Sequence, residues 1–152
     1  METTAIHIRL ATFDDLPDVQ SCARAAYAKY VERMSQKPAP MIADFTSQIK
    51  LEQVHIAICD SFFAGYVVFY QDTNHLHLEN VAVVPAHSGK GIGKQLIEYV
   101  EHAALKKGLH AVELYTNEAM TENLAMYPSL GYVETGRKQQ DGFYRVFFRK
   151  PV

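Results

Sequence analysis

The chain has 152 residues, a net charge of −2 and 48% hydrophobic against 21% charged residues. The length suits one domain, and the apolar content excludes a disordered chain, which lacks the apolar surface to offset its ordering entropy. Because the net charge is close to zero, no global field attracts the protein to nucleic acid or to an anionic membrane. We therefore expect neither as a partner.

The longest apolar run, residues 62–70, is too short for a membrane-spanning helix, which needs about 20 residues. Residues 1–7 contain neither the basic nor the apolar segment of a signal peptide. We therefore expect a cytoplasmic protein. In that compartment Cys22 and Cys59 are expected to be buried free thiols rather than a disulfide.

The N-terminal half predicts a strand, two helices and an antiparallel meander. Residues 6–10 alternate between apolar and polar, as in a strand. Thr12 and Asp15 have the spacing of a capping box, and a helix with one apolar face follows to Met34. Residues 35–40 form a loop with two prolines, and a shorter helix includes Met41, Ile42, Phe45 and Ile49. Short connections join the predicted strands of the meander, which cover residues 54–59, 63–70 and 75–84.

The C-terminal half begins with a glycine-rich loop that opens a helix over residues 92–107, ended by Gly108. A strand over residues 111–116 follows, and the order strand, helix, strand predicts a parallel pair. A helix over residues 121–130 and a hairpin of strands over 132–137 and 143–150 complete the chain. The sequence thus predicts one domain over residues 1–152, of the α/β class (mixed α+β), with about seven strands in a central mixed sheet and flanking helices.

The most specific motif is the segment Ser88-Gly89-Lys90-Gly91-Ile92-Gly93-Lys94, between a strand and a helix. Glycine allows positive φ and close approach of a ligand, and a helix N-terminus offers unpaired N–H groups and partial positive charge. Together they predict a cradle for a phosphate or pyrophosphate, to which Lys90 and Lys94 add charge. The glycine spacing excludes the Walker P-loop and the dinucleotide fingerprint.

This loop resembles the acyl-CoA loop of the GCN5-related N-acetyltransferases (GNAT), Arg/Gln-x-x-Gly-x-Gly/Ala, except that Ser88 replaces the first residue. Residues 79–85 resemble the family's fourth strand, and residues 123–132 resemble its Asn-x-x-x-Tyr-x-x-x-Gly-Tyr signature. The resemblance implies the GNAT fold and direct transfer of an acetyl group from acetyl-CoA, the cosubstrate, to a primary amine. The implied acceptor is a small molecule or a peptide N-terminus, and no metal is expected.

The resemblance also implies which residues hold the cosubstrate. Backbone N–H groups of the loop would bind the pyrophosphate, the strand before it would align the pantetheine, and an N–H near Val81 or Ala82 would polarise the thioester carbonyl. Asn123 matches a family asparagine that contacts CoA, with a helix N-cap as the alternative. The expected cosubstrate-binding residues are Val81, Ala82, Val83, Ser88, Gly89, Lys90, Gly91, Ile92, Gly93, Lys94, Asn117 and Asn123.

Tyr127 matches the family's tyrosine acid, which protonates the departing CoA thiolate; the alternative is a core tyrosine. Glu79 is the candidate base, acting through water, and its alternatives are a solvent-facing side chain or one that only orients the substrate. Strand alternation places Glu79 on one face with His75 and His77, where we expect solvated side chains rather than a metal site. The expected acceptor wall contains Tyr27, Tyr30, Met41 and Tyr115, and the equal alternative for each is a core position.

A non-catalytic acyl-CoA-binding or sensor protein is the alternative function, because Ser88 departs from the family pattern. The presence of Tyr127 argues against it. The acceptor itself stays open among aminoglycosides, polyamines, amino acids and protein N-termini. Phe147 is expected to be exposed, which is compatible with a homodimer.

Overall fold

The computed structural model describes residues 6–34 and 37–152, which fall into two compact units. Residues 1–5, in the segment without signal-peptide features, and residues 35–36 of the predicted loop lie outside the described residues. The first unit holds the chain up to residue 69 and residues 80–98, and the second holds residues 70–79 and 99–152. No helix in the described part of the chain has the length and apolar character needed to cross a membrane.

The seven strands of the described residues are ordered β1-β2-β3-β4-β5-β7-β6 in one mixed sheet, which confirms the predicted fold class. Four α-helices accompany them in this part of the chain. The elements are β1 (Ile6–Leu10), α1 (Leu16–Tyr27), α2 (Phe45–Lys50), β2 (Val54–Cys59), β3 (Phe62–Asp72), β4 (His75–Val83), α3 (Ile92–Lys106), β5 (Ala111–Asn117), α4 (Thr121–Ser129), β6 (Val133–Gln140) and β7 (Phe143–Pro151).

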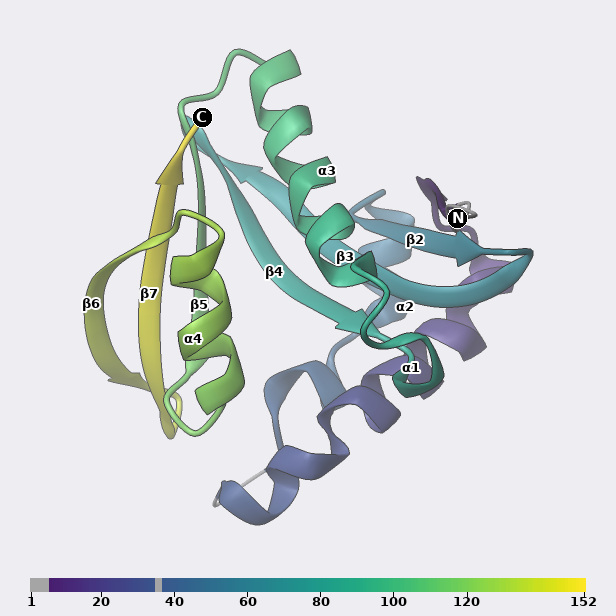
Figure 1. Cartoon of the computed structure of the whole chain (residues 1–152), viewed down its shortest axis with the longest axis horizontal. Helices are drawn as coiled ribbons and strands as arrows, with labels where there is room; N and C mark the ends of the chain where they lie inside the picture. Colours follow the sequence, from purple (N-terminus) through teal and green to yellow (C-terminus); the bar gives the residue numbers. More distant parts are fainter. Residues whose placement is uncertain (1–5, 35–36) are drawn as a thin grey trace. The chain divides into compact units, whose positions relative to one another are not determined.

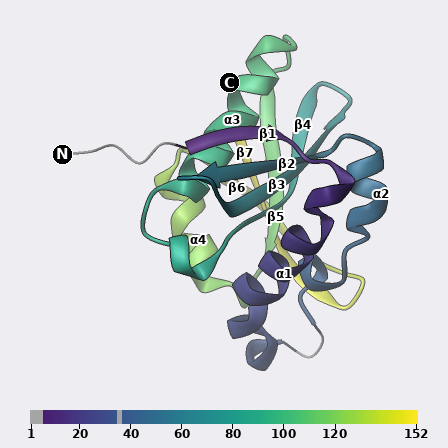
Figure 2. The same ribbon diagram turned by 90° about the vertical axis from the view of Figure 1, so that its right-hand side faces the viewer.

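In the first unit β1, β2 and β3 form an antiparallel sheet, in which the three strands lie side by side (Figure 2). Asp60 and Ser61 connect β2 to β3 with φ of +50° and +72°. Two positive φ angles match the twist of a tight hairpin, so the turn forms without the glycine that usually marks it. The two cysteines are buried thiols, as expected.

Both predicted N-terminal helices are shorter than expected. The α-helix α1 ends at Tyr27, and residues Ala28–Arg33 continue as a tighter 3₁₀ segment, which keeps Tyr30 buried. Met41 and Ile42 lie in a separate 3₁₀ turn, and α2 begins only at Phe45. Helix α2 begins at Phe45 because the Asp44 carboxylate accepts a hydrogen bond from the Ser47 N–H at 3.1 Å and so caps the helix.

The predicted pairing of Thr12 with Asp15 is present at the start of the first helical segment. The Asp15 carboxylate accepts from the Thr12 N–H at 2.8 Å, while the Thr12 carbonyl accepts from the Asp15 N–H at 3.0 Å. The Arg9 guanidinium donates to both Asp15 oxygens, at 2.9 and 3.0 Å. The hydrogen bond from Arg9, opposed by burial, holds the pKa of Asp15 below its usual value.

Asp15→Asn is expected to lower the free energy of unfolding by about 1 kcal/mol at pH 7. A carboxyl whose pKa is lowered by folding stabilises the fold above its unfolded-state pKa, and this stabilisation is lost as pH falls through the folded-state pKa. The difference in melting temperature from wild type should therefore shrink as pH falls from about 5 toward 2. Asp14→Asn, at an exposed neighbour, is the control. A difference for Asp15→Asn that stays constant with pH would contradict the pairing.

In the second unit, β4 pairs with β5 in parallel and β5 pairs with β7 in antiparallel fashion. The predicted C-terminal hairpin forms, with β7 placed between β5 and the edge strand β6. Helix α4 lies beside β7 (Figure 1), and the Tyr127 and Phe148 ring centroids are 5.8 Å apart. The buried side chains Leu76, Val112, Leu114 and Val146 line the interior of these strands.

The prediction that Phe147 is exposed is wrong. Phe147 is half-buried, because its ring lies 5.5 Å from the Tyr115 ring and the Lys138 amine lies over it at 5.8 Å. Antiparallel pairing of β7 with β5 brings Tyr115 opposite Phe147, which the sequence of β7 by itself does not indicate. Phe147 thus carries no argument for a homodimer.

Candidate functional site

The glycine-rich loop of the first unit has the backbone geometry of an anion-binding nest. Gly89 and Gly91 have φ of +81° and +77°, whereas Lys90 between them does not have a positive φ. Alternating φ signs turn successive N–H groups toward one side, which makes a concave site for an anion. A Cβ atom at either glycine would meet nothing within 4 Å, so the positive φ and not a lack of space requires glycine here.

The loop leads directly into the N-terminus of α3. Ile92 and Leu96 are almost fully buried and hold the first turns of the helix in place. The first helical hydrogen bond comes from the Gln95 N–H to the Gly91 carbonyl, at 3.1 Å, so the helix itself does not use the preceding N–H groups. These N–H groups and the partial positive charge of the helix end fit a phosphate group next to the nest.

Side chains of the loop contribute in different ways. The Ser88 hydroxyl donates to the Pro85 carbonyl at 2.7 Å and closes the turn before the loop, a role that needs neither arginine nor glutamine. Lys90 is exposed, with its amine 3.2 Å from Nδ1 of His87. Lys94 is also exposed, and its amine lies 4.0 Å from the Glu98 carboxylate. The two lysines therefore leave positive charge at the rim of the loop.

The strand segment before the loop is anchored by Tyr27. The Tyr27 hydroxyl lies 2.9 Å from the Val81 carbonyl and 3.1 Å from Oδ1 of Asn80. Tyr27 is itself buried, so this contact fixes the end of β4 to α1 within the first unit. Sequence reasoning placed Tyr27 only in an acceptor wall and missed this role, since the partners are 54 and 53 residues apart. Ala82 is buried, and Val81 and Val83 are half-buried.

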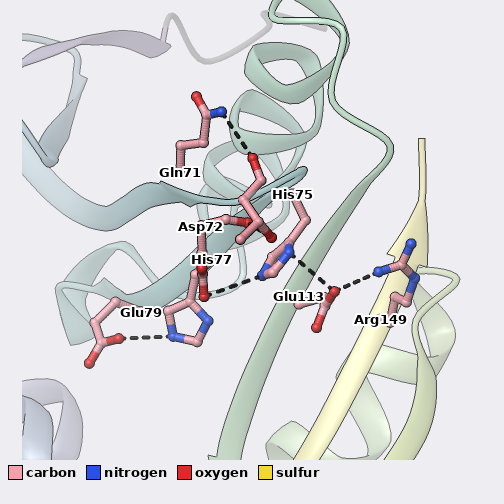
Figure 3. Close-up of polar contacts among 8 residues, drawn as sticks. Gln71, Asp72, His75, His77, Glu79, Glu113 and Arg149 are labelled. Atoms are coloured by element: carbon pink, nitrogen blue, oxygen red, sulfur yellow. Dashed lines mark hydrogen bonds and ion pairs between the residues drawn. The ribbon is translucent and has the colours of Figure 1, made fainter.

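In the second unit, Glu79 lies in a polar cluster with His77. Figure 3 shows the two side chains of β4 facing each other, with Nε2 of His77 2.9 Å from the Glu79 carboxylate. Burial alternates along β4, so these two residues share a face with His75, as predicted. The hydrogen bond from His77, opposed by burial, holds the pKa of Glu79 below its usual value. The Arg145 charge and the Tyr70 hydroxyl act in the same direction, so Glu79 is ionised at neutral pH.

His75 belongs to a separate network. Its ring lies 3.4 Å from the Glu113 carboxylate and 3.9 Å from the Asp72 carboxylate, and Arg149 of β7 binds Glu113 (Figure 3). His75 and His77 therefore turn to different carboxylates. No group of three or more histidine, cysteine or acidic side chains suited to a metal ion is found in the described residues.

Three further residues surround Glu79, and only Tyr115 was expected. Tyr70 and Tyr115 flank the His77 ring, with centroid distances of 5.2 and 5.4 Å. The Arg145 guanidinium covers the Tyr115 ring at 4.4 Å. Partial burial raises the pKa of Tyr70 to about 12, with the Glu79 charge acting in the same direction, and burial likewise raises the pKa of Tyr115. Both phenols therefore stay protonated at neutral pH.

The ionised Glu79 is better suited to attract an ammonium group than to deprotonate it directly. Amines in peptides and lysine have pKa values of about 8 to 10, several units above that of a carboxyl. Direct transfer of a proton from the ammonium to Glu79 is thus strongly uphill. A carboxylate that binds the ammonium and orders a water molecule fits the lowered pKa of Glu79.

The remaining site candidates lie in α4 and in the connection that leads into it. Tyr127 is buried, and its ring lies 5.7 Å from the Tyr132 ring in an edge-on arrangement. Asn123 donates to the Thr116 hydroxyl at 3.1 Å, and Oδ1 of Asn117 accepts from the Ala119 N–H at 2.8 Å. Both amides thus hold the connection from β5 to α4. The alternative of Asn123 as an N-cap is wrong, because the helix begins at Thr121 with Met120 at the cap position.

The predicted site residues are divided between the two units. The end of β4 and the loop, from Val81 to Lys94, belong to the first unit. Glu79, Asn117, Asn123 and Tyr127 belong to the second unit, where Glu79 lies in the cluster with His77, and Asn117 and Asn123 hold the connection from β5 to α4. Two residues of the cluster around Glu79, Arg145 and Tyr70, were not predicted as site residues. Nothing in their local sequence indicates that they lie near Glu79.

Comparison with known proteins identifies a family. The model described as the acetyltransferase (GNAT) family matches residues 21–132. None of the curated proteins compared matches the chain. The crystal structure of the PaiA N-acetyltransferase from Thermoplasma acidophilum, in complex with coenzyme A, is similar over 97% of this chain and 99% of its own, with a TM-score of 0.81 and 20% identity.

A second similar structure is the ribosomal-protein-S18-alanine N-acetyltransferase from Escherichia coli. It matches over 97% of this chain and 94% of its own, with a TM-score of 0.77 and 19% identity. The two structural similarities show that this chain shares the fold of both proteins.

Proposed function

Because the chain belongs to the GNAT family of acetyltransferases, we propose that it transfers an acetyl group from acetyl-CoA to a primary amine of a small molecule or a peptide N-terminus. The observation that carries the proposal is the nest of Gly89 and Gly91 at the N-terminus of α3. This backbone geometry fits a pyrophosphate, which coenzyme A carries. The similar Thermoplasma acidophilum enzyme was crystallised with coenzyme A, which supports this ligand.

In this proposal the first unit binds the cosubstrate. The N–H groups of Gly89 to Lys94 hold the pyrophosphate, with Ser88 bounding the loop and Lys90 and Lys94 at its rim. The backbone of Val81, Ala82 and Val83 aligns the pantetheine and polarises the thioester carbonyl. The Val81 carbonyl accepts from the Tyr27 hydroxyl, which fixes this end of β4 in place for the ligand. In the second unit, Asn117 and Asn123 are the proposed contacts to the pantetheine arm.

The transfer itself needs one nucleophile and two proton movements. The neutral amine attacks the thioester carbon, a C–N bond forms, and the C–S bond breaks. The proton lost by the amine passes through water ordered by Glu79, whose carboxylate is ionised at neutral pH, to the solvent, and Tyr127 regains from the solvent the proton that it gives to the thiolate. The departing thiolate takes a proton from the Tyr127 hydroxyl, because a phenol is protonated at pH 7 and can donate without a shifted pKa.

Coenzyme A is expected to raise the melting temperature of the protein by about 5 to 10 °C at about 100 times its Kd, whereas ATP and NAD leave it unchanged. Gly91→Ala is expected to weaken this shift, because alanine disfavours the positive φ that forms the nest. Gly108→Ala is the matched control. Gly108 also has a positive φ and open space around it, but it follows the C-terminus of α3.

Equal loss of the coenzyme A shift in the two glycine variants would contradict the proposed binding loop. Turnover is then measured as thiol release from acetyl-CoA with a panel of amines. Binding of acetyl-CoA without turnover of any amine would favour a non-catalytic acyl-CoA-binding protein. No binding of coenzyme A would refute the proposed function altogether.

A further inference from the structure

Arg145 on β7 is a largely buried cation close to the candidate base. Its side chain is only 14% exposed. The guanidinium lies over the Tyr115 ring at 4.4 Å and 5.6 Å from the Phe143 ring, so one of its faces is covered by aromatic carbon. Stacking of this kind orients the guanidinium and leaves its edge as the side that can bind a ligand.

The protein satisfies only part of the hydrogen-bonding capacity of this guanidinium, which has five N–H donors. Within residues 6–34 and 37–152, its one hydrogen bond goes to Oε1 of Gln140, at 3.1 Å. The nearest carboxylate is that of Asp141, 3.6 Å away in the hairpin turn, and the Asp141 side chain is 82% exposed. An exposed partner at this distance neutralises a largely buried charge poorly. The site therefore has capacity for a further anionic group.

Glu79 supplies the opposite charge in the same unit. Its side chain is 29% exposed, and its carboxylate contacts His77. The charge of Arg145 acts on Glu79, yet no ion pair within 4 Å joins these two described residues. The rings of Tyr70, His77 and Tyr115 follow one another at 5.2 and 5.4 Å, with Glu79 beside His77 and Arg145 over Tyr115. Glu79 also hydrogen-bonds with Tyr70 and Tyr115, so the carboxylate and the guanidinium both border Tyr115 without pairing with each other.

We propose that the acceptor carries a carboxylate as well as its primary amine, as in a free α-amino acid, with the carboxylate on Arg145 and the amine at Glu79. This inference rests on the proposed function and narrows its substrate class. A planar guanidinium binds a carboxylate through two parallel hydrogen bonds, which fixes the acceptor in one orientation. A polyamine lacks any group for Arg145 and is repelled by it, so the same pair of charges selects against purely cationic acceptors.

The experiment compares matched acceptors that differ only in the carboxylate. Amino acids, their α-amides and the corresponding decarboxylated amines are tested as sets that share a side chain, with acetyl-CoA at saturation. With wild type, kcat/KM is expected to be about 10- to 100-fold higher for the amino acid than for its amide. Arg145→Gln should remove most of this preference, because it lowers the value for the amino acid far more than the value for the amide.

Two further variants separate recognition from folding. Arg145→Lys keeps the charge but loses the planar pair of donors, so it should keep only part of the preference. Arg137→Gln removes an exposed cation of β6, 52% exposed, and should leave the preference as in wild type. The melting temperature of Arg145→Gln shows whether this variant folds. If it does not fold, the ratio of kcat/KM for amino acids to that for amides, measured with wild type and with Arg145→Lys, still tests the inference.

Equal kcat/KM values of the wild type for amino acids and for their amides would overturn this inference. It would also be overturned if Arg145→Lys lowered kcat/KM by the same factor for amino acids and for amides. In either case, the proposed function is still supported if the protein binds coenzyme A and acetylates some amine. If coenzyme A binds and no acceptor of any set reacts, the proposed function fails and this inference fails with it.

Discussion

Tyr127→Phe is expected to slow acetyl transfer about 10- to 1,000-fold at saturating acetyl-CoA, while binding of acetyl-CoA stays close to wild type. The substitution removes only the hydroxyl that we propose as the proton donor to the thiolate. Because the phenyl ring stays, the contacts of Tyr127 with Tyr132 and Phe148 are kept, and the melting temperature should change little. The measurement is thiol release from acetyl-CoA with the best amine found in the panel.

Tyr132→Phe is the matched control for this variant. It removes the hydroxyl of an adjacent buried tyrosine, which donates to the Glu101 carboxylate at 2.9 Å. The Lys150 amine lies 3.1 Å from the other Glu101 oxygen, so the carboxylate keeps a partner. We expect turnover close to wild type. If Tyr127→Phe retained more than about half of the wild-type kcat, or if the two variants lost activity equally, Tyr127 would be a core residue and not the acid.

Gly65→Ala is expected to destabilise the protein by about 1 to 3 kcal/mol, which lowers the melting temperature by about 3 to 10 °C. A Cβ atom at this position of β3 would lie 2.5 Å from the Ala82 carbonyl oxygen and 3.2 Å from Cα of Val83. Both are backbone atoms of the first unit and cannot turn aside as a flexible side chain can. The strands must shift instead, in the segment of β4 proposed to align the pantetheine.

Gly136→Ala provides the comparison in a position without this constraint. Gly136 lies in the edge strand β6, has no positive φ, and has nothing within 4 Å of an added Cβ. Thermal unfolding of the two variants should show a loss for Gly65→Ala and little change for Gly136→Ala. Similar melting temperatures would mean that β3 and β4 accommodate the methyl group, contrary to the close approach in the structure.

The features that sequence reasoning predicted correctly depend on residues close together in the chain. Alternation placed His77 and Glu79 on one face of β4, and these side chains are paired because strand residues two apart always share a face. The link between Thr12 and Asp15 follows from spacing alone, as does the loop, whose glycines take positive φ at Gly89 and Gly91. Local backbone geometry determines each of these features.

Predictions failed where a nearby competing interaction or a distant contact decided the outcome. The second helix starts at Phe45 rather than at Met41, because Asp44 offers a cap that the apolar spacing does not reveal. Asn123 is not a cap, because its amide bonds back to Thr116 at the end of β5. Phe147 is half-buried because strand pairing places Tyr115 opposite it.

The family resemblance, the glycine loop at the start of α3 and the face of β4 that presents Glu79 can all be predicted from residues that are close together in the chain. The surroundings of Glu79 and the anchor of Val81 instead depend on contacts between distant segments. Arg145 reaches the Tyr115 ring because β7 pairs with β5, and the Tyr27 hydroxyl reaches the Val81 carbonyl across 54 residues. Strand order and register bring these groups together. The residues next to each other in the chain specify neither the order nor the register, because the same alternation of apolar and polar residues is compatible with many strand pairings.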